Sequence, residues 1–134
     1  MSLQRVKDLH RDLSHALTRL KEALQEDASK STIIIDGVIQ RFEFTFELAW
    51  KLMKFILNYQ GIEALTPRSV IKEAFKAKLI QEGKEWIDML EDRNKTSHIY
   101  DEKEAQRIYE KIKDNHLRLL ENLKQKTQSL LKDL

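Results

Sequence analysis

Apolar residues recur along this chain at spacings of three and four, which is the period of an amphipathic helix. The first stripe spans roughly residues 3–26 and is followed by the polar stretch EDASKST. Its members are Leu3, Val6, Leu9, Leu13, Leu17, Leu20 and Leu24. A last stripe begins after Asp101 and keeps the same spacing to Leu134. The pattern therefore predicts a long helix at each end of the chain, and two such helices can pack antiparallel along their length.

The segment from Ile33 to Tyr59 is apolar around well over half of its circumference on a helical wheel of about 100° per residue. One apolar face contains Phe42, Phe46, Ala49, Trp50, Met53, Ile56 and Leu57. A second contains Phe44, Leu48, Leu52, Phe55 and Tyr59. A surface helix usually carries a single apolar stripe. The second face therefore needs a further partner, and either a central place in a small bundle or a dimer interface would provide one.

Turn signals divide the rest of the chain. Gly61 ends the second helix, and Thr66 with Pro67 predicts the start of a short helix over residues 67–80. Gly83 interrupts the pattern before a fourth helix, whose apolar positions point inward. The sequence thus predicts an all-α, up-and-down bundle of about four long helices plus a short one.

Composition agrees with this picture. The chain has 134 residues, with only 3 Gly and 1 Pro, so we expect residues 1–134 to form a single helical domain. Cysteine is absent, which excludes disulfides and zinc–thiolate sites. Because no signal peptide and no apolar run of membrane-spanning length is evident, we expect a cytoplasmic protein without membrane contact.

The charge balance limits the possible partners. The 24 basic and 22 acidic residues give a net charge of +2. This is not the footprint of tight, non-specific nucleic-acid binding. Any contact with RNA would have to be local, or be assembled from more than one chain.

The stretch EDRNKTSHIYDE, residues 91–102, departs from the regular helical pattern because it groups Arg93, Asn94, His98 and Tyr100. Histidine exchanges protons near neutral pH, and arginine offers a planar set of donors to phosphate oxygens. With a ribose 2′-hydroxyl as the internal nucleophile, this pair can cleave RNA without a metal. An arginine and a histidine also occur together by chance in many helical proteins, so the residues alone leave both interpretations open.

Other candidate residues have simpler explanations. His10 and His15 are five positions apart, the wrong spacing for a shared metal on a helix, and His116 lies on an apolar stripe. Glu43 and Glu47 share a face, and Glu47 can pair with Lys51 one turn later, which favours a solvated polar strip over a catalytic carboxylate pair. We therefore expect no metal and no cofactor.

The motif RNKTSHIY has the form Arg–x4–His–x–Tyr, which resembles the signature of HEPN-domain toxins that are paired with minimal nucleotidyltransferase antitoxins. The stretches IQRFEFTFELAWKLMK and WIDMLEDRNKTSHIY are also similar to the family of nucleotidyltransferase substrate-binding proteins. The resemblance covers roughly residues 3–125.

This resemblance implies a HEPN-like bundle that forms a homodimer, with two Arg/His motifs facing each other. It implies a metal-independent endoribonuclease, the toxin of a toxin–antitoxin module, with Arg93 and His98 catalytic and Asn94 assisting. It also implies a partner nucleotidyltransferase that silences the toxin by transferring AMP to Tyr100. Two alternatives are a non-catalytic subunit that binds substrate for that nucleotidyltransferase, and a helical scaffold without a ligand.

Overall fold

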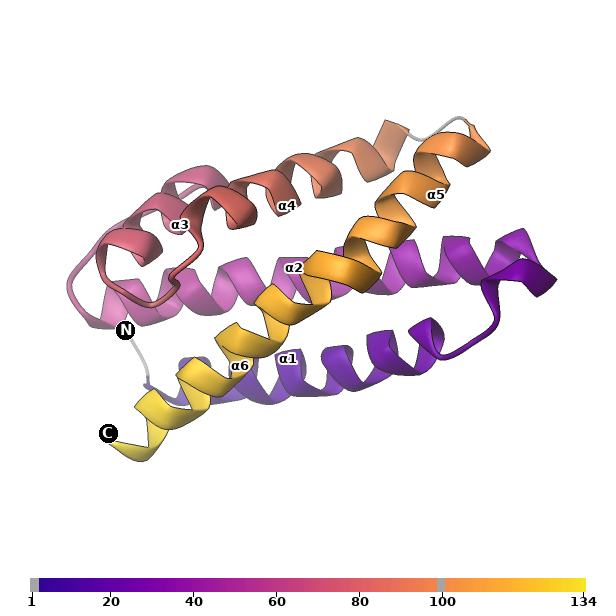
Figure 1. The fold of residues 1–134 in the computed structure, drawn as a ribbon. Helices are drawn as coiled ribbons and strands as arrows, with labels where there is room; N and C mark the ends of the chain where they lie inside the picture. The colour runs from indigo at the N-terminus through magenta and orange to yellow at the C-terminus, as the bar shows by residue number, and fades with distance from the viewer. Residues whose placement is uncertain (1–2, 99–100) are drawn as a thin grey trace.

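The computed structural model describes residues 3–98 and 101–134, and the regular elements in these ranges are all helical (Figure 1). They are α1 (Leu3–Leu24), η1 (Ala28–Lys30), α2 (Thr32–Tyr59), α3 (Pro67–Lys76), α4 (Gly83–Lys95), η2 (Thr96–His98), α5 (Glu102–Lys111), η3 (Ile112–His116) and α6 (Leu117–Lys132). The all-α bundle expected from the hydrophobic pattern is confirmed. None of the described helices combines the length and the apolar character that crossing a membrane requires.

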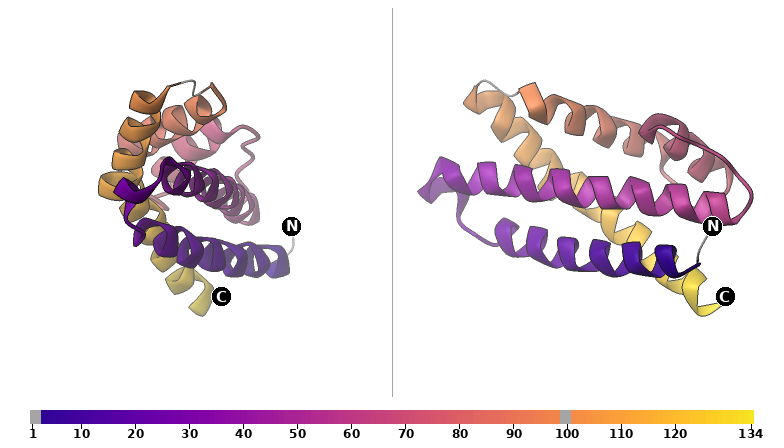
Figure 2. Two further views of the ribbon diagram at one scale, coloured as in Figure 1. Left: turned by 90° about the vertical axis from the view of Figure 1, so that its right-hand side faces the viewer. Right: turned by 180° about the vertical axis from the view of Figure 1, so that it is seen from behind.

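The helices α1 and α2 form an antiparallel pair, and α3 and α4 lie on the other side of α2 (Figures 1 and 2). The elements α5, η3 and α6 continue one another as a single rod that crosses this layer obliquely. The rod contacts α2 with α5 and contacts α1 with α6. The last helix therefore does not follow α1 along its whole length, and the first part of the rod reaches the end of α4 instead.

The short helix α3 shows how local signals set the element boundaries. Thr66 caps its start, as the sequence predicts, and Ser69 completes a reciprocal cap, because each side chain accepts from the backbone N–H of the other. The helix ends at Lys76, earlier than the expected 67–80, because Lys78 adopts the left-handed region at φ 63°. The interruption before α4 therefore comes from this turn, and Gly83 is already the first residue of α4.

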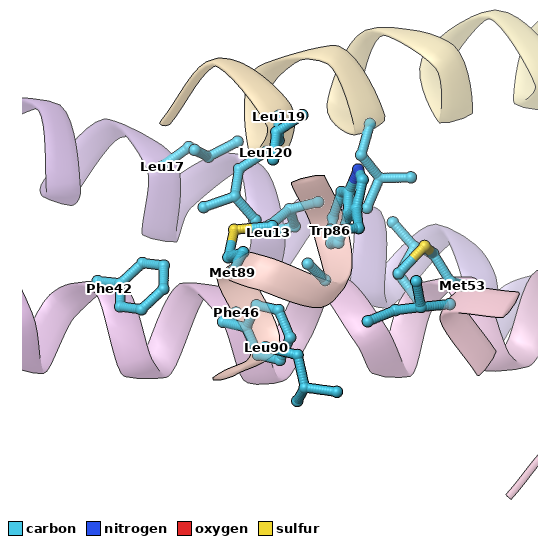
Figure 3. Close-up of a cluster of buried hydrophobic side chains, with 14 of the residues drawn as sticks. Leu13, Leu17, Phe42, Phe46, Met53, Trp86, Met89, Leu90, Leu119 and Leu120 are labelled. Atoms are coloured by element: carbon cyan, nitrogen blue, oxygen red, sulfur yellow. The ribbon is translucent and has the colours of Figure 1, made fainter. Parts of the chain in front are cut away.

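The core lies between α1, α2, α4 and α6 (Figure 3). The residues labelled in that view are Leu13, Leu17, Phe42, Phe46, Met53, Trp86, Met89, Leu90, Leu119 and Leu120. Trp86 is 2% exposed, and its ring lies 6.3 Å from that of Phe46. This aromatic contact fixes α4 against α2, so the packing of the core also determines where the far end of α4 lies.

The second apolar face expected on α2 is only partly uncovered. Leu52 is fully buried, and Leu48 and Phe55 are partly buried against the core, so the same chain supplies the partner for this part of the face. Phe44 and Tyr59 remain 63% and 46% exposed. This face is therefore open to a partner at Phe44, near the middle of α2, and at Tyr59, its last residue, and dimerisation stays a prediction.

Candidate active site at the junction of α4 and α5

The Arg–x4–His motif lies at the junction between the end of α4 and the start of α5. Arg93 and Asn94 occupy the last turn of α4, and His98 ends the short turn η2. The Thr96 hydroxyl donates to the backbone oxygen of Arg93 at 2.6 Å, and the Ser97 hydroxyl donates to that of Asn94 at 3.2 Å. Such local hydrogen bonds compete with helix continuation. The helix therefore ends inside the motif, as the sequence predicts.

Two of the expected site residues share an open depression at this junction. Asn94 and His98 line it, and both are exposed. The other lining residues are Arg68, Glu91, Lys95, Asp101 and Glu104. Asp101 also caps α5, because its carboxylate accepts from the backbone N–H of Glu104 at 2.8 Å. Tyr100, the expected modification site, lies outside the described residues.

Arg93 is turned towards α2 rather than into this depression. Its Nη2 donates to Oε2 of Glu47 at 2.8 Å, and its Nη1 lies 3.4 Å from Oδ1 of Asn94. The side chains of Arg93 and Glu47 are each 34% exposed, so the pair is accessible to solvent. Glu47 also lies 3.5 Å from Lys51, the pairing expected from the sequence. Among the described residues no hydrogen bond joins Arg93 to His98, so the two side chains are not a preformed catalytic pair within one chain.

The buried carboxylate beside the motif was missed by reasoning from the sequence. Asp92 is 2% exposed, and its Oδ2 lies 2.8 Å from Nε2 of His116. Its Oδ1 accepts from Nη2 of Arg107 at 2.9 Å. His116 is fully buried and stacks on Phe42 with 5.5 Å between ring centroids, so it is the satisfied core histidine that its apolar stripe suggested. The sequence did indicate that Asp92 would be buried, because it follows Met89 by three positions and therefore lies on the inward face of α4.

Asp92 is held as a carboxylate despite its burial. Desolvation alone would raise the pKa of Asp92, but hydrogen bonds from His116 and Arg107, together with their charge, outweigh it and hold that pKa below its ordinary value. The pKa of Arg107 is raised by its hydrogen bonds to Glu104 and Asp92. The carboxylate next to Arg93 is therefore ionised and fully paired at neutral pH.

The remaining histidines lie away from the motif. His10 pairs through Nε2 with the backbone oxygen of Lys124 at 3.2 Å, and His15 is exposed on α1. Within residues 3–98 and 101–134, no three His, Asp or Glu side chains are grouped in a way that would hold a metal ion.

A helical bundle that presents arginine, asparagine and histidine where two of its helices meet has the architecture of a HEPN-like domain. The chain belongs to the family described as nucleotidyltransferase substrate binding protein like, whose model matches residues 8–129. The description of the family thus associates it with nucleotidyltransferases.

Two kinds of relatives carry different descriptions. The chain is 37% identical over 103 residues to the probable ribonuclease HepT of Haemophilus influenzae, a match that covers 71% of this chain and 70% of that protein. A solved structure from Thermus thermophilus is 35% identical with a TM-score of 0.77, covering 90% of this chain and 98% of that one. Another, from Haemophilus influenzae, is 25% identical with a TM-score of 0.68, covering 95% and 99%, and is described as the fold of a substrate binding domain of a nucleotidyltransferase.

Proposed function

We propose that this protein is the toxin of a toxin–antitoxin module, a cytoplasmic endoribonuclease that cleaves RNA without a metal. The observation that carries the proposal is the solvent-accessible set of Arg93, Asn94 and His98 at the α4–α5 junction of a chain related to a probable ribonuclease. A pure binding module has no need of a proton-exchanging histidine and a phosphate-binding arginine five positions apart.

The chemistry follows from these side chains. The ribose 2′-oxygen attacks the adjacent phosphorus, its proton passes to a base, and the 5′-oxygen leaves with a proton from an acid. His98 exchanges one of these protons, and Arg93 stabilises the charge that builds on the phosphoryl oxygens. The products are a 2′,3′-cyclic phosphate and a 5′-hydroxyl. Arginine has five N–H donors, so the contacts of Arg93 with Glu47 and Asn94 leave others for phosphate.

A second copy of the chain would complete this site. Each protomer offers one motif histidine, whereas the reaction needs both a base and an acid. Two motifs facing each other across a homodimer would provide both. The open depression beside Asn94 and His98 supports RNA as the substrate, because an RNA strand needs an accessible surface rather than an enclosed cavity.

Replacing the exposed Phe44 with glutamate is expected to weaken this homodimer while leaving the monomer folded. Phe44 is 63% exposed, so the charge costs little in the monomer, whereas in an apolar interface it would be desolvated. Light scattering should give twice the 15.9 kDa chain mass for the wild type and a lower mass for Phe44→Glu. The matched control is Ile33→Glu, which changes a 75% exposed residue at the start of the same helix. A wild type that stays a folded monomer at high concentration would contradict the proposal.

The alternative, a non-catalytic subunit that binds substrate for a nucleotidyltransferase, is favoured by the family description and by the description of the second solved structure. One experiment separates the two functions. The purified protein is incubated with RNA in excess EDTA, and the ends of the products are analysed. We expect cleavage that leaves 2′,3′-cyclic phosphates. Intact RNA, together with stimulation of the partner nucleotidyltransferase, would favour the binding subunit instead.

A further inference from the structure

Arg107 bridges the two ends of the segment that carries the motif. Its Nη2 donates to Oδ1 of Asp92 at 2.9 Å and to Oε1 of Glu104 at 3.1 Å, and its Nε donates to Oε2 of Glu104 at 3.3 Å. Asp92 directly precedes Arg93, whereas Glu104 lies in the first turn of α5. One guanidinium thus ties together the residues that enter and leave the junction.

We infer that Arg107 is a positioning residue for the motif, a clamp that sets the separation of Asp92 and Glu104 and thereby orients Arg93, Asn94 and His98. The inference rests on the proposed ribonuclease function. Nothing in the Arg–x4–His spacing points to Arg107, which lies beyond the motif on the exposed side of α5.

The clamp differs from an ordinary surface ion pair because one of its partners is buried. Exposed ion pairs contribute little to stability. The Asp92 side chain is only 3% exposed, however, and its other oxygen is already engaged by His116. Without Arg107, one oxygen of the buried Asp92 carboxylate would lose its partner. Leaving a buried charge without its partner is strongly destabilising. The end of α4 would then have to shift, or water would have to enter, to satisfy Asp92.

The other contacts at the junction tie it to different elements. Arg93 joins the end of α4 to Glu47 of α2, and Asp92 joins it to His116 of η3, so neither contact links α4 to the start of α5.

The hydrogen bonds of Thr96 and Ser97 stay within the segment, so they fix its local shape and not its place relative to α5. In the described residues, the other ion pair between α4 and α5 joins Lys111 to Asp88 at 2.6 Å, about one helical turn further from the motif. That pair restrains the helices but does not touch the junction.

A shift of the junction would affect catalysis more than binding. Phosphate binding depends on charge that tolerates small displacements, whereas proton transfer and transition-state stabilisation require reacting atoms to be placed closely, and a misplacement of about 1 Å can cost about 10²-fold. We therefore expect Arg107→Gln to lower kcat for RNA cleavage by about 10-fold or more, with KM nearly unchanged. Arg107→Lys should be intermediate, since lysine keeps the charge but lacks the planar fork that reaches both carboxylates.

The matched control is Lys111→Gln, which removes a similarly exposed cation, 38% against 41% for Arg107, from an ion pair between the same two helices whose carboxylate is exposed. We would measure kcat, KM and Tm for all variants, together with hydrogen–deuterium exchange of the peptide spanning residues 93–104. The expected result is a lower kcat and faster exchange in Arg107→Gln, and neither change in Lys111→Gln. Equal kcat and equal exchange in the two variants would overturn the clamp.

The two proposals fail in different ways. If the wild type does not cleave RNA, the ribonuclease function is wrong, and the exchange comparison still tests whether Arg107 restrains the junction. If the wild type cleaves RNA but Arg107→Gln keeps its kcat, the function stands and the positioning role is wrong. If kcat falls equally in Arg107→Gln and Lys111→Gln, the cause is general destabilisation, and the positioning role of Arg107 is wrong.

Discussion

Replacing His98 with alanine is expected to lower RNA cleavage by about 10²–10⁴-fold, the typical effect of losing a positioned acid–base group. Replacing Arg93 with alanine is expected to lower it by about 10²–10³-fold, the typical effect of losing a donor that stabilises charge in the transition state. His98 is exposed and Arg93 is partly exposed at a helix end, so neither truncation opens a cavity in the core. Removing Arg93 also leaves Glu47 with Lys51 as a partner. The loss should therefore appear in kcat, with helical content and Tm close to those of the wild type.

The measurement is cleavage of a defined RNA with EDTA present, alongside circular dichroism of each variant. Suitable controls are His15→Ala and Arg11→Ala, which remove an exposed histidine and an exposed arginine from α1, away from the junction. In cells, the two motif variants should relieve growth arrest and the two controls should not. Full activity in Arg93→Ala or His98→Ala, or activity that appears only with added metal, would refute the mechanism.

The helices were predictable because their signals are local. The stripe of apolar residues at spacings of three and four places α1 and α2 close to their observed bounds, and Thr66 and Asp101 cap the helices that follow them. The early end of α3 was not predictable, because a lysine at position 78 takes a backbone conformation that usually marks glycine.

The motif residues were also readable from the sequence, whereas their partners were not. Glu47 is 46 positions from Arg93, and Arg107 is 15 from Asp92, so these contacts exist only after α2, α4 and α5 have packed. The helical wheel placed Glu47 in a polar strip beside Lys51, which is correct but incomplete. Tertiary packing determines which charged residues become neighbours of the motif. A single sequence does not show which of these distant residues come together when the chain folds.

Packing also decides between the two alternatives left open for the second apolar face of α2. The wheel assigns Leu52 and Phe44 to one face, but the helices on both sides of α2 cover most of its circumference. Leu52 is consequently buried within the monomer, while Phe44, near the middle of α2, stays exposed. An apolar face on an isolated helix therefore predicts that a partner exists, without saying whether the partner belongs to the same chain.

Co-expression with the cognate nucleotidyltransferase is expected to abolish the ribonuclease activity by adding AMP to Tyr100. In this transfer the phenol oxygen bonds to the α-phosphorus of a nucleoside triphosphate, pyrophosphate leaves, and the phenol proton is lost. In the sequence, Tyr100 stands between His98 and Asp101, two residues that line the open depression at the junction. A nucleotide attached there would have the reach to occupy the surface on which the RNA backbone is proposed to lie.

Two physical effects would then act together. The added phosphate carries negative charge and strong acceptors, which compete with RNA for the cationic side chains Arg93 and Lys95. The nucleoside would block entry to His98 sterically. Because both effects are local, inhibition requires no change of fold, and the modified protein should keep the Tm of the unmodified one within a few degrees.

Intact mass followed by peptide mapping tests this prediction directly. The chain has three tyrosines, and the other two provide matched controls, since Tyr59 is 46% exposed and Tyr109 is 5% exposed. Tyr59→Phe and Tyr109→Phe should still gain AMP and be silenced, whereas Tyr100→Phe should stay unmodified and remain active beside the partner. AMP on another residue would show that Tyr100 is not the target. Silencing of Tyr100→Phe without any AMP would show that the partner inhibits by binding alone, because the variant lacks only the hydroxyl that accepts the group.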